Sequence, residues 1–321
     1  MTETFAVAPD KTMLALRARA RGDPEQLVSE RMPLPSPGIG DVLLRVHAAS
    51  FTPTELDWPS TWVDRAGRER RAPIPAHEVS GVVVALGYGT TGFAIGEPVY
   101  GLTDWYRDGA AAEYAAVEAR NLAPKPRSLD HIHAAAVPLA GLTAWQGLFD
   151  HGGLSRGQTV LIHGAGGGVG TFAVQLARSA GARVVATGRA SAGELVRELG
   201  ADQFVDVDRQ RFEDAAGHVD LVLDLVGGET QERSWAVVKP GGVLVSVVGG
   251  VSVPAGRRDA RGVFFVVEPD RAALRELTRR IDAGELRSVV GDVLPLERGR
   301  EAFEAKRRSG IPGKVVLQIA A

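Results

Sequence analysis

The sequence contains no cysteine among its 321 residues, which excludes disulfide bonds, thiol nucleophiles and thiolate zinc sites. It also lacks an apolar run of about 18 residues, the length that a membrane-spanning helix needs. Its first residues show no pattern of a secretory signal. The formal net charge is −2, so the broad basic surface of a nucleic-acid-binding protein is missing. These absences lead us to expect a cytoplasmic protein without a membrane or nucleic-acid partner.

Glycine is abundant instead, with 39 residues. Residues 1–127 contain short apolar runs, such as 41–46 and 79–86, separated by turns rich in proline and glycine, which favours β-structure. Residues 128–265 begin with an apolar helix near 132–149 and then alternate strands with helices. This alternation predicts a parallel sheet covered by helices on both faces.

The second part has a regular order of predicted elements. Strands are expected at 159–163, 183–187, 204–207, 220–225 and 242–248, and helices at 169–180, 192–200, 209–216 and 229–238. Residues 266–321 are expected to form a helix near 270–283 and then short strands that return to the first part. We therefore predict an α/β protein with a β-rich domain (1–127 and 266–321) and an inserted, doubly wound domain (128–265).

A glycine-rich segment follows a buried strand and precedes an amphipathic helix. Its residues are Gly164, Ala165, Gly166, Gly167, Gly168, Val169 and Gly170, so it departs from a strict G-x-G-x-x-G at Ala165. Glycine permits the tight turn and lets the backbone approach a pyrophosphate, at which the helix N–H groups point. The segment predicts a dinucleotide site, and a glycine-rich loop of some other α/β enzyme is the alternative.

The next strand ends at Gly188 and Arg189, where NAD-binding domains usually carry an acidic residue for the ribose hydroxyls. We interpret Arg189, together with Arg178 on the preceding helix, as ligands of a 2′-phosphate. This interpretation predicts NADPH as the cofactor. Two solvated surface arginines are the alternative.

Several characteristic segments follow one another along the chain. They include PLPSPGIGDVLLRVHAAS (33–50), PIPAHEVSGVVVALG (73–87), AAVPLAGLTAWQGL (135–148) and VLIHGAGGGVG (160–170). In this order they resemble the medium-chain dehydrogenase/reductase superfamily, specifically its zinc-free quinone oxidoreductase (ζ-crystallin-like) branch. The resemblance covers essentially the whole chain. It implies a GroES-like catalytic domain with an inserted Rossmann domain. It also implies a homodimer joined through an edge strand of the Rossmann sheet.

The resemblance also implies residues around the nicotinamide. It places Thr143 and the turns Val226–Gly227 and Val248–Gly249 near the ring. The segment 262–268 resembles the one whose backbone holds the carboxamide, and Lys314 is expected within reach of a phosphate. Its candidate residues are Phe264, Phe265 and Val266. Buried sheet core for the phenylalanines and a solvated lysine are the alternatives.

This sequence departs from the zinc-dependent members of the family. The stretch that carries a cysteine in those members reads AASFTPTE (48–55) here, and Thr52 replaces the asparagine of the zinc-free pattern. His77 stands where zinc members place a histidine ligand. A lone histidine without thiolate partners is a poor zinc site. We therefore predict no metal and expect His77 to pack beneath the substrate or to contact it.

Aromatic residues gather in loops of the first part, which favours an apolar site for a conjugated ligand. The candidate substrate residues are Thr52, Glu55, Asp57, Trp58, His77 and Trp105. Core packing or a dimer contact is the alternative for the aromatic residues, and a solvated surface position for the acids. Tyr106 is the candidate proton donor, with water as the alternative.

The sequence thus predicts a zinc-independent, NADPH-dependent oxidoreductase. Its hydride acceptor would be a quinone or the C=C bond of an α,β-unsaturated carbonyl, because both accept hydride by conjugate addition. A zinc-assisted alcohol dehydrogenase is one alternative. The other is a non-catalytic NADPH-binding redox sensor.

Overall fold

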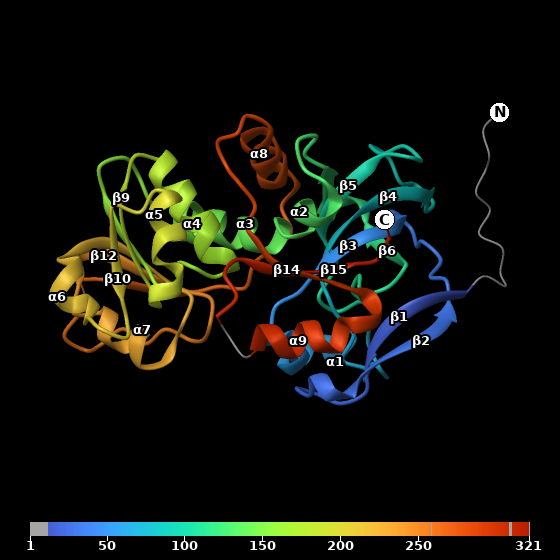
Figure 1. Cartoon of the computed structure of the whole chain (residues 1–321), viewed down its shortest axis with the longest axis horizontal. Helices are drawn as coiled ribbons and strands as arrows, with labels where there is room; N and C mark the ends of the chain where they lie inside the picture. Colours follow the sequence, from blue (N-terminus) through green and yellow to red (C-terminus); the bar gives the residue numbers. More distant parts are fainter. Residues whose placement is uncertain (1–11, 258, 308–309, 321) are drawn as a thin grey trace. The chain divides into compact units, whose positions relative to one another are not determined.

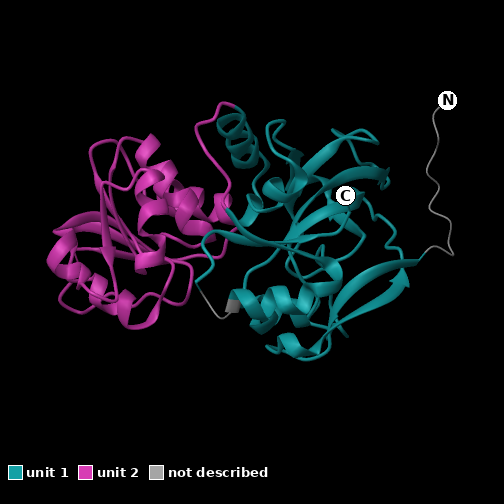
Figure 2. Cartoon of the chain, in the orientation of Figure 1, with its two compact units in different colours: residues 1–139, 269–282, 290–321 teal, residues 140–268, 283–289 magenta. Residues whose placement is uncertain are grey.

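The computed structural model describes residues 12–257, 259–307 and 310–320 (Figure 1). The chain forms two compact units (Figure 2). Unit 1 comprises Met1–Leu139, Pro269–Asp282 and Val290–Ala321, and unit 2 comprises Ala140–Glu268 and Ala283–Val289. No helix within the described residues is long and apolar enough to cross a membrane.

Unit 1 is built on a seven-stranded sheet and a two-stranded ribbon. The sheet runs in the order β14-β15-β3-β4-β5-β7, and β6 pairs with β3. Its strands are β3 (Asp41–Ser50), β4 (Glu78–Leu86), β5 (Pro98–Leu102), β6 (Tyr114–Glu118), β7 (Leu122–Pro124), β14 (Val290–Pro295) and β15 (Lys314–Gln318). The ribbon pairs β1 (Thr12–Ala18) with β2 (Leu27–Pro33). Because β15 pairs with β3, distant parts of the sequence form one sheet, as expected for a GroES-like domain.

Short helices complete unit 1. They are α1 (Pro59–Trp62), α2 (His131–Ala135), α8 (Arg271–Asp282) and α9 (Gly299–Arg307). Helix α9 was not predicted, because the tail was expected to be β-rich. It buries Ala302 and Phe303, and the Phe303 ring stacks on Phe51 with 3.8 Å between the ring centroids. This contact joins α9 to the segment that follows β3.

Unit 2 is a doubly wound domain with a six-stranded parallel sheet. The strand order is β10-β9-β8-β11-β12-β13, the Rossmann order with its reversal between β8 and β11. The strands are β8 (Thr159–Ile162), β9 (Arg183–Gly188), β10 (Gln203–Asp206), β11 (Val219–Asp224), β12 (Val238–Ser246) and β13 (Arg261–Phe264). The connecting helices are α4 (Gly168–Ser179), α5 (Gly193–Glu198), α6 (Phe212–Ala216) and α7 (Gly228–Ser234). Strands β8 to β12 overlap the apolar runs from which strands were predicted.

The single helix predicted near 132–149 is divided in the structure. Helix α2 ends at Ala135, α3 spans Pro138–Trp145, and a π-helical turn follows at Gln146–His151. Pro138 begins α3 because proline has no N–H to donate, which suits the first turn of a helix and disrupts its interior. An apolar run alone does not reveal such a break.

The unit boundaries differ from the predicted domain boundaries. The first unit extends to Leu139 rather than to residue 127, because α2 packs against β3 and β4. Residues 283–289 belong to unit 2. There the Gln175 side chain on α4 binds the Arg287 backbone, donating to its carbonyl at 3.1 Å and accepting from its N–H at 2.9 Å. In the sheet of unit 2, β12 lies between β11 and β13, so β13 forms the edge at that end of the sheet.

Tyr100 provides a test of how unit 1 holds α8. Its hydroxyl lies 2.7 Å from the Leu274 carbonyl and 2.9 Å from the Thr278 hydroxyl. We expect Tyr100→Phe to lower the free energy of unfolding by about 1 kcal/mol, because a buried carbonyl loses its donor. The measurement is the urea midpoint, with the exposed Tyr88→Phe as the control. Equal midpoints for the two variants would contradict this role.

Candidate functional site

The glycine turn of unit 2 is built for a close approach of its backbone. A Cβ on Gly170 would lie 2.4 Å from the Gly164 carbonyl oxygen, and one on Gly166 would lie 2.4 Å from the Ala192 Cβ. Gly164 has φ = +70°, a conformation that glycine adopts at little cost. The Ala165 N–H donates to the Thr187 carbonyl, which ties the turn to β9. Larger residues at positions 166 and 170 would therefore open this turn.

Helix α4 begins directly at this turn and presents free N–H groups. Its N-cap is Gly167, which has no side chain to cap the helix, and its first turn carries no acidic residue. The first N–H groups of a helix lack partners within it, and the helix dipole favours an anion there. The segment 164–170 thus offers the cradle that a pyrophosphate requires.

His163 directly precedes the glycine turn and supports it through hydrogen bonds. It was not predicted as a site residue from the sequence. Its imidazole is buried, and the two ring nitrogens lie 2.9 Å from the hydroxyls of Thr187 and Ser234. Burial lowers the pKa of His163 to about 4, so the ring is neutral at physiological pH. A neutral imidazole can connect β8, β9 and α7 without a buried charge.

The structure separates the two arginines that were predicted to share a 2′-phosphate. Arg189 is exposed and follows β9 at the carboxyl end of the strand, next to Gly188. Arg178 lies in the last turn of α4, about 15 Å along the helix from the glycine turn at 1.5 Å per residue. Its guanidinium pairs with Asp202 at 2.8 Å. The interpretation of Arg178 as a cofactor ligand is wrong, because α4 runs away from the phosphate end.

The turns after β11 and β12 form a hollow of about 230 Å³. Its lining includes Gly227, Val248 and Gly249, three of the residues predicted near the nicotinamide. Val226 and Val248 are each about half exposed, at 50% and 51%. The carboxyl ends of parallel strands are where ligands bind in doubly wound sheets. The structure therefore brings both predicted turns to one surface.

The segment after β13 gives a mixed result. Phe264 and Val266 are exposed, at 46% and 63%, whereas Phe265 is buried with its ring 4.4 Å from that of His151. Phe265 is a core residue of unit 2, which is the alternative named for it. Thr143 on α3 is buried, and its hydroxyl has no hydrogen-bond partner within the described residues.

Lys314 does not serve a phosphate. It is buried at the start of β15 in unit 1, and its ammonium donates to the Phe51 carbonyl at 2.8 Å and pairs with the Glu78 carboxylate. Removing a charge from water is costly unless it is paired, so this contact fixes the lysine in place. The predicted phosphate contact is corrected to a buried ion pair.

His77 and two tryptophans form an aromatic group in unit 1. The His77 ring is buried, with Nδ1 2.6 Å from the Thr103 hydroxyl. The Trp105 ring lies 5.1 Å from His77 and 5.5 Å from Trp58, in edge-to-face arrangements. Burial, with a smaller contribution from Arg70, lowers the pKa of His77 to about 3. His77 is therefore a neutral imidazole at physiological pH and carries no imidazolium proton.

Glu55 is neither a solvated acid nor placed to meet a substrate. It is 1% exposed, and its carboxylate accepts from the backbone N–H groups of Ala76 and Thr52. Burial raises the pKa of Glu55 to about 7, and these two donors and Lys314 oppose the rise. Glu55 thus braces the loop that carries the exposed Asp57 and the half-buried Trp58.

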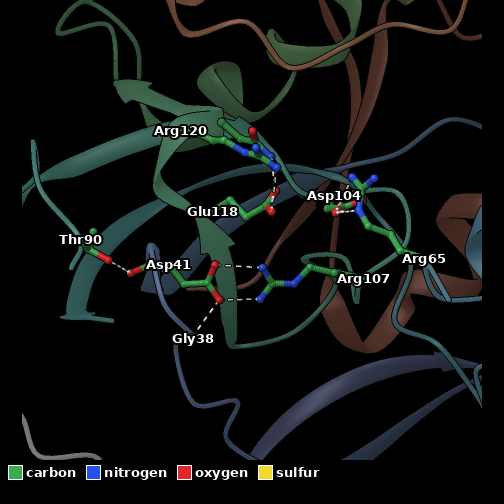
Figure 3. Close-up of polar contacts among 9 residues, drawn as sticks. Gly38, Asp41, Arg65, Thr90, Asp104, Arg107, Glu118 and Arg120 are labelled. Atoms are coloured by element: carbon green, nitrogen blue, oxygen red, sulfur yellow. Dashed lines mark hydrogen bonds and ion pairs between the residues drawn. The ribbon is translucent and has the colours of Figure 1, made fainter. Parts of the chain in front are cut away.

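The loop that carries Trp105 and Tyr106 is held at both ends by ion pairs (Figure 3). Asp104 pairs with Arg65 and accepts from the Tyr106 N–H at 2.9 Å. Arg107 makes two hydrogen bonds with the buried Asp41, at 2.9 and 2.7 Å. The Arg65 guanidinium also lies 5.2 Å from the centre of the Tyr106 ring. These contacts give the two candidate aromatic residues a defined position.

Comparison with known proteins agrees with this geometry. The family described as "Alcohol dehydrogenase GroES-like domain" matches residues 38–127, and the one described as "Zinc-binding dehydrogenase" matches residues 199–317. A "Probable zinc-binding oxidoreductase, mitochondrial" from Arthroderma benhamiae is 34% identical over 91% of this chain and 93% of its own. This chain belongs to the medium-chain dehydrogenase/reductase superfamily, in its quinone-oxidoreductase-like branch.

Two further relatives of this dehydrogenase/reductase have more specific names. The "NADPH-dependent alkenal/one oxidoreductase, chloroplastic" of Arabidopsis thaliana is 32% identical over 86% of this chain and 71% of its own. The structure of a quinone oxidoreductase from Coxiella burnetii has a TM-score of 0.87 at 27% identity, covering 96% of this chain and all of that one. The chain is an oxidoreductase of this superfamily, and a nicotinamide cofactor suits its glycine turn.

The names of one matching family and one relative of this dehydrogenase/reductase include zinc, which needs a set of protein ligands. The sequence has no cysteine, and Nδ1 of His77 is engaged by Thr103. Across 12–257, 259–307 and 310–320, no group of three or more His, Asp and Glu residues is placed to hold a metal ion. Catalytic zinc sites need three protein ligands, so these residues supply no such site.

The high pKa of Glu55 predicts a pH-dependent stability. An acid whose pKa rises from 4.5 unfolded to about 7 folded contributes its full stability below the unfolded pKa and loses it as pH rises through the folded value. Relative to Glu55→Gln, the wild type should lose up to about 3 kcal/mol between about pH 4.5 and 8. Urea unfolding across this range measures the difference.

Glu25→Gln is the matched control, because Glu25 is exposed in the same unit. Its difference from the wild type should stay nearly constant over the same pH range. A constant difference for Glu55→Gln as well would contradict the buried, protonatable state of Glu55.

Proposed function

We propose that this chain reduces a quinone or the C=C bond of an α,β-unsaturated carbonyl with NADPH and without zinc. The observation that carries the proposal is the environment of His77, a neutral imidazole bound to Thr103 and flanked by Trp105. Beside the buried His77, the partly exposed rings of Trp58 and Trp105 offer flat apolar surfaces. A conjugated acceptor suits them, because delocalisation into its own carbonyl stabilises the charge that hydride addition creates.

NADPH would supply the hydride, and the chain would supply binding and orientation. The segment 164–170 would hold the pyrophosphate, Arg189 would bind the 2′-phosphate, and the turns at Val226 and Val248 would receive the nicotinamide half. The backbone of Phe264 and Val266, together with Thr143, remains a candidate for nicotinamide contacts. The name of the Arabidopsis relative, an NADPH-dependent enzyme acting on alkenals and alkenones, supports this assignment.

In unit 1 the substrate contacts would come from Trp58, Trp105 and His77, with Thr52 and Asp57 on the adjoining loop. Hydride addition to the electron-poor carbon leaves an enolate or hydroquinone anion, and one proton completes the reaction. Tyr106 is the candidate donor for that proton, and water is the alternative. His77 has no imidazolium proton to give, because its pKa is about 3, and Nδ1 of its neutral ring is engaged by Thr103.

The assembly is a further proposal. Strand β13 is one of the two outer strands of the unit 2 sheet, and an edge strand presents unpaired N–H and C=O groups. We propose that a second copy of the chain pairs along this edge to form a homodimer.

The first experiment measures NADPH and NADH oxidation with a benzoquinone, a naphthoquinone, a linear enone, an enal and a simple ketone. We expect turnover with quinones or enones that a chelator does not change. Turnover with the ketone alone, lost on chelation, would show a zinc-assisted alcohol dehydrogenase instead. Tight NADPH binding with no turnover of any acceptor would favour a redox sensor.

The role of Arg189 is tested by Arg189→Ala. A charge-assisted contact to a phosphate contributes about 1.5–3 kcal/mol, so kcat/KM with NADPH should fall about 10- to 150-fold. The value with NADH should change little. Arg178→Ala is the matched control, because Arg178 pairs with Asp202 at the other end of α4. Equal losses with both cofactors would argue against a 2′-phosphate contact at Arg189.

A further inference from the structure

Asp224 is the last residue of β11 and is fully buried. One carboxylate oxygen accepts from the backbone N–H groups of Val226 and Gly227, at 3.0 and 2.9 Å. The other accepts from the Gln231 amide at 3.0 Å and from the Ser246 hydroxyl at 2.8 Å. Four donors therefore converge on one carboxylate.

Ser246 extends this arrangement to the neighbouring strand. It is the last residue of β12, it is fully buried, and it lies opposite Asp224 in the parallel register. While its hydroxyl donates to Asp224, its oxygen accepts from the Val248 N–H at 3.2 Å. One buried group thus connects the turn after β11 with the turn after β12.

The chemistry of these contacts requires a carboxylate. An ionised carboxylate only accepts hydrogen bonds, whereas an asparagine amide would direct two N–H donors at groups that are themselves donors. Every accepting position of this buried carboxylate is engaged by a donor of the chain itself. Its contacts suit the placement of the two turns.

These turns line the hollow of about 230 Å³, in which Gly227, Gln231, Val248 and Gly249 take part. Three of these four residues, Gly227, Gln231 and Val248, are hydrogen-bonded to the Asp224–Ser246 pair, and Gly249 directly follows Val248. A shift of a few tenths of an ångström in either turn would change the spacing of the two half-exposed valines, Val226 and Val248.

We propose that Asp224, acting through Ser246, is a positioning residue that sets the spacing of the two turns that receive the nicotinamide half of the cofactor. This inference rests on the proposed function, because it takes the hollow as the nicotinamide end of that site. The buried Asp224–Ser246 pair, which lies outside the glycine turn, would thus help to hold the nicotinamide half of the dinucleotide.

The test compares binding of the whole dinucleotide with binding of its adenosine end. Calorimetry gives Kd for NADPH and for 2′,5′-ADP, which carries the adenosine and the 2′-phosphate but no nicotinamide. If the wild type prefers NADH, the pair is NADH and AMP. The variants are Ser246→Ala, which removes the link to Val248, and Asp224→Asn, which also weakens the turn at Val226.

We expect Ser246→Ala to weaken NADPH binding about tenfold and 2′,5′-ADP binding less than twofold, with kcat reduced and the fold intact. Asp224→Asn should show a larger loss with the same selectivity. Ser246→Thr keeps the hydroxyl and should restore much of the NADPH affinity. If Asp224→Asn does not fold, Ser246→Ala and Ser246→Thr decide the question.

Asp220→Asn is the matched control. Asp220 lies on the same strand near its other end, where its carboxylate accepts from the Thr159 N–H at 2.7 Å and from Lys239 at 2.8 Å. This substitution should lower the unfolding midpoint and leave the ratio of the two Kd values unchanged. It separates a general loss of stability from a loss of positioning.

Two results would overturn the inference. Equal weakening of NADPH and 2′,5′-ADP in Ser246→Ala would show a general structural role, and unchanged Kd values would show no role. In either case a wild type that binds and oxidises NADPH leaves the proposed function standing. A wild type that binds neither NADPH nor NADH would overturn the proposed function and this inference together.

Discussion

A charge removed from water must be paired or fully hydrogen-bonded, and each unit is organised around one such charge. In unit 1, Lys314 at the start of β15 pairs with Glu78 on β4 and donates to the Phe51 carbonyl. That arrangement fixes the segment before Glu55 and the strand that begins beside His77. In unit 2, Asp224 gathers four donors from the turns after β11 and β12. The apolar cores make each unit stable, while these buried polar contacts hold particular loops and turns within each unit.

Much of the fold could be predicted from the sequence, because the decisive signals are local. Strands buried on both faces are continuous apolar runs, as in β8 and β11, and the glycine turn lies between one of them and α4. The cradle at Gly170 was predictable for the same reason, since strand, turn and helix are adjacent in the chain. The divided helix at Pro138 and the unexpected α9 show the limit. An apolar run does not reveal where a helix breaks, and α9 is defined by a contact between Phe303 and Phe51, which are far apart in sequence.

The candidate site was harder to predict, because the state of a charged side chain depends on distant partners. Lys314 was expected at a phosphate and Glu55 at a substrate. Both are buried, Lys314 against Glu78 on β4 and Glu55 against the backbone of the segment before β4. The prediction that Arg178 binds the 2′-phosphate was wrong for a geometric reason. Arg178 lies in the last turn of α4, a helix of 12 residues, far from the glycine turn at its start. Asp224 carried a signal that could have been used. It is an acid inside the apolar run LVLDLV, and such a residue is retained only where several donors satisfy it.

The pairing of β15 with β3 also has a consequence for how the protein is made. A ribosome completes the six strands of unit 2 when it has added Phe264, whereas the sheet of unit 1 still lacks β14 and β15, which end at Gln318. Since domains generally fold as units during synthesis, the sheet of unit 2 can form before the sheet of unit 1 is complete. During that interval Glu78 has no lysine beside it, and residues 48–50 of β3 lack the partner that β15 supplies. The nascent chain therefore holds an acid without its ion-pair partner and a strand end without its neighbour until β15 is added.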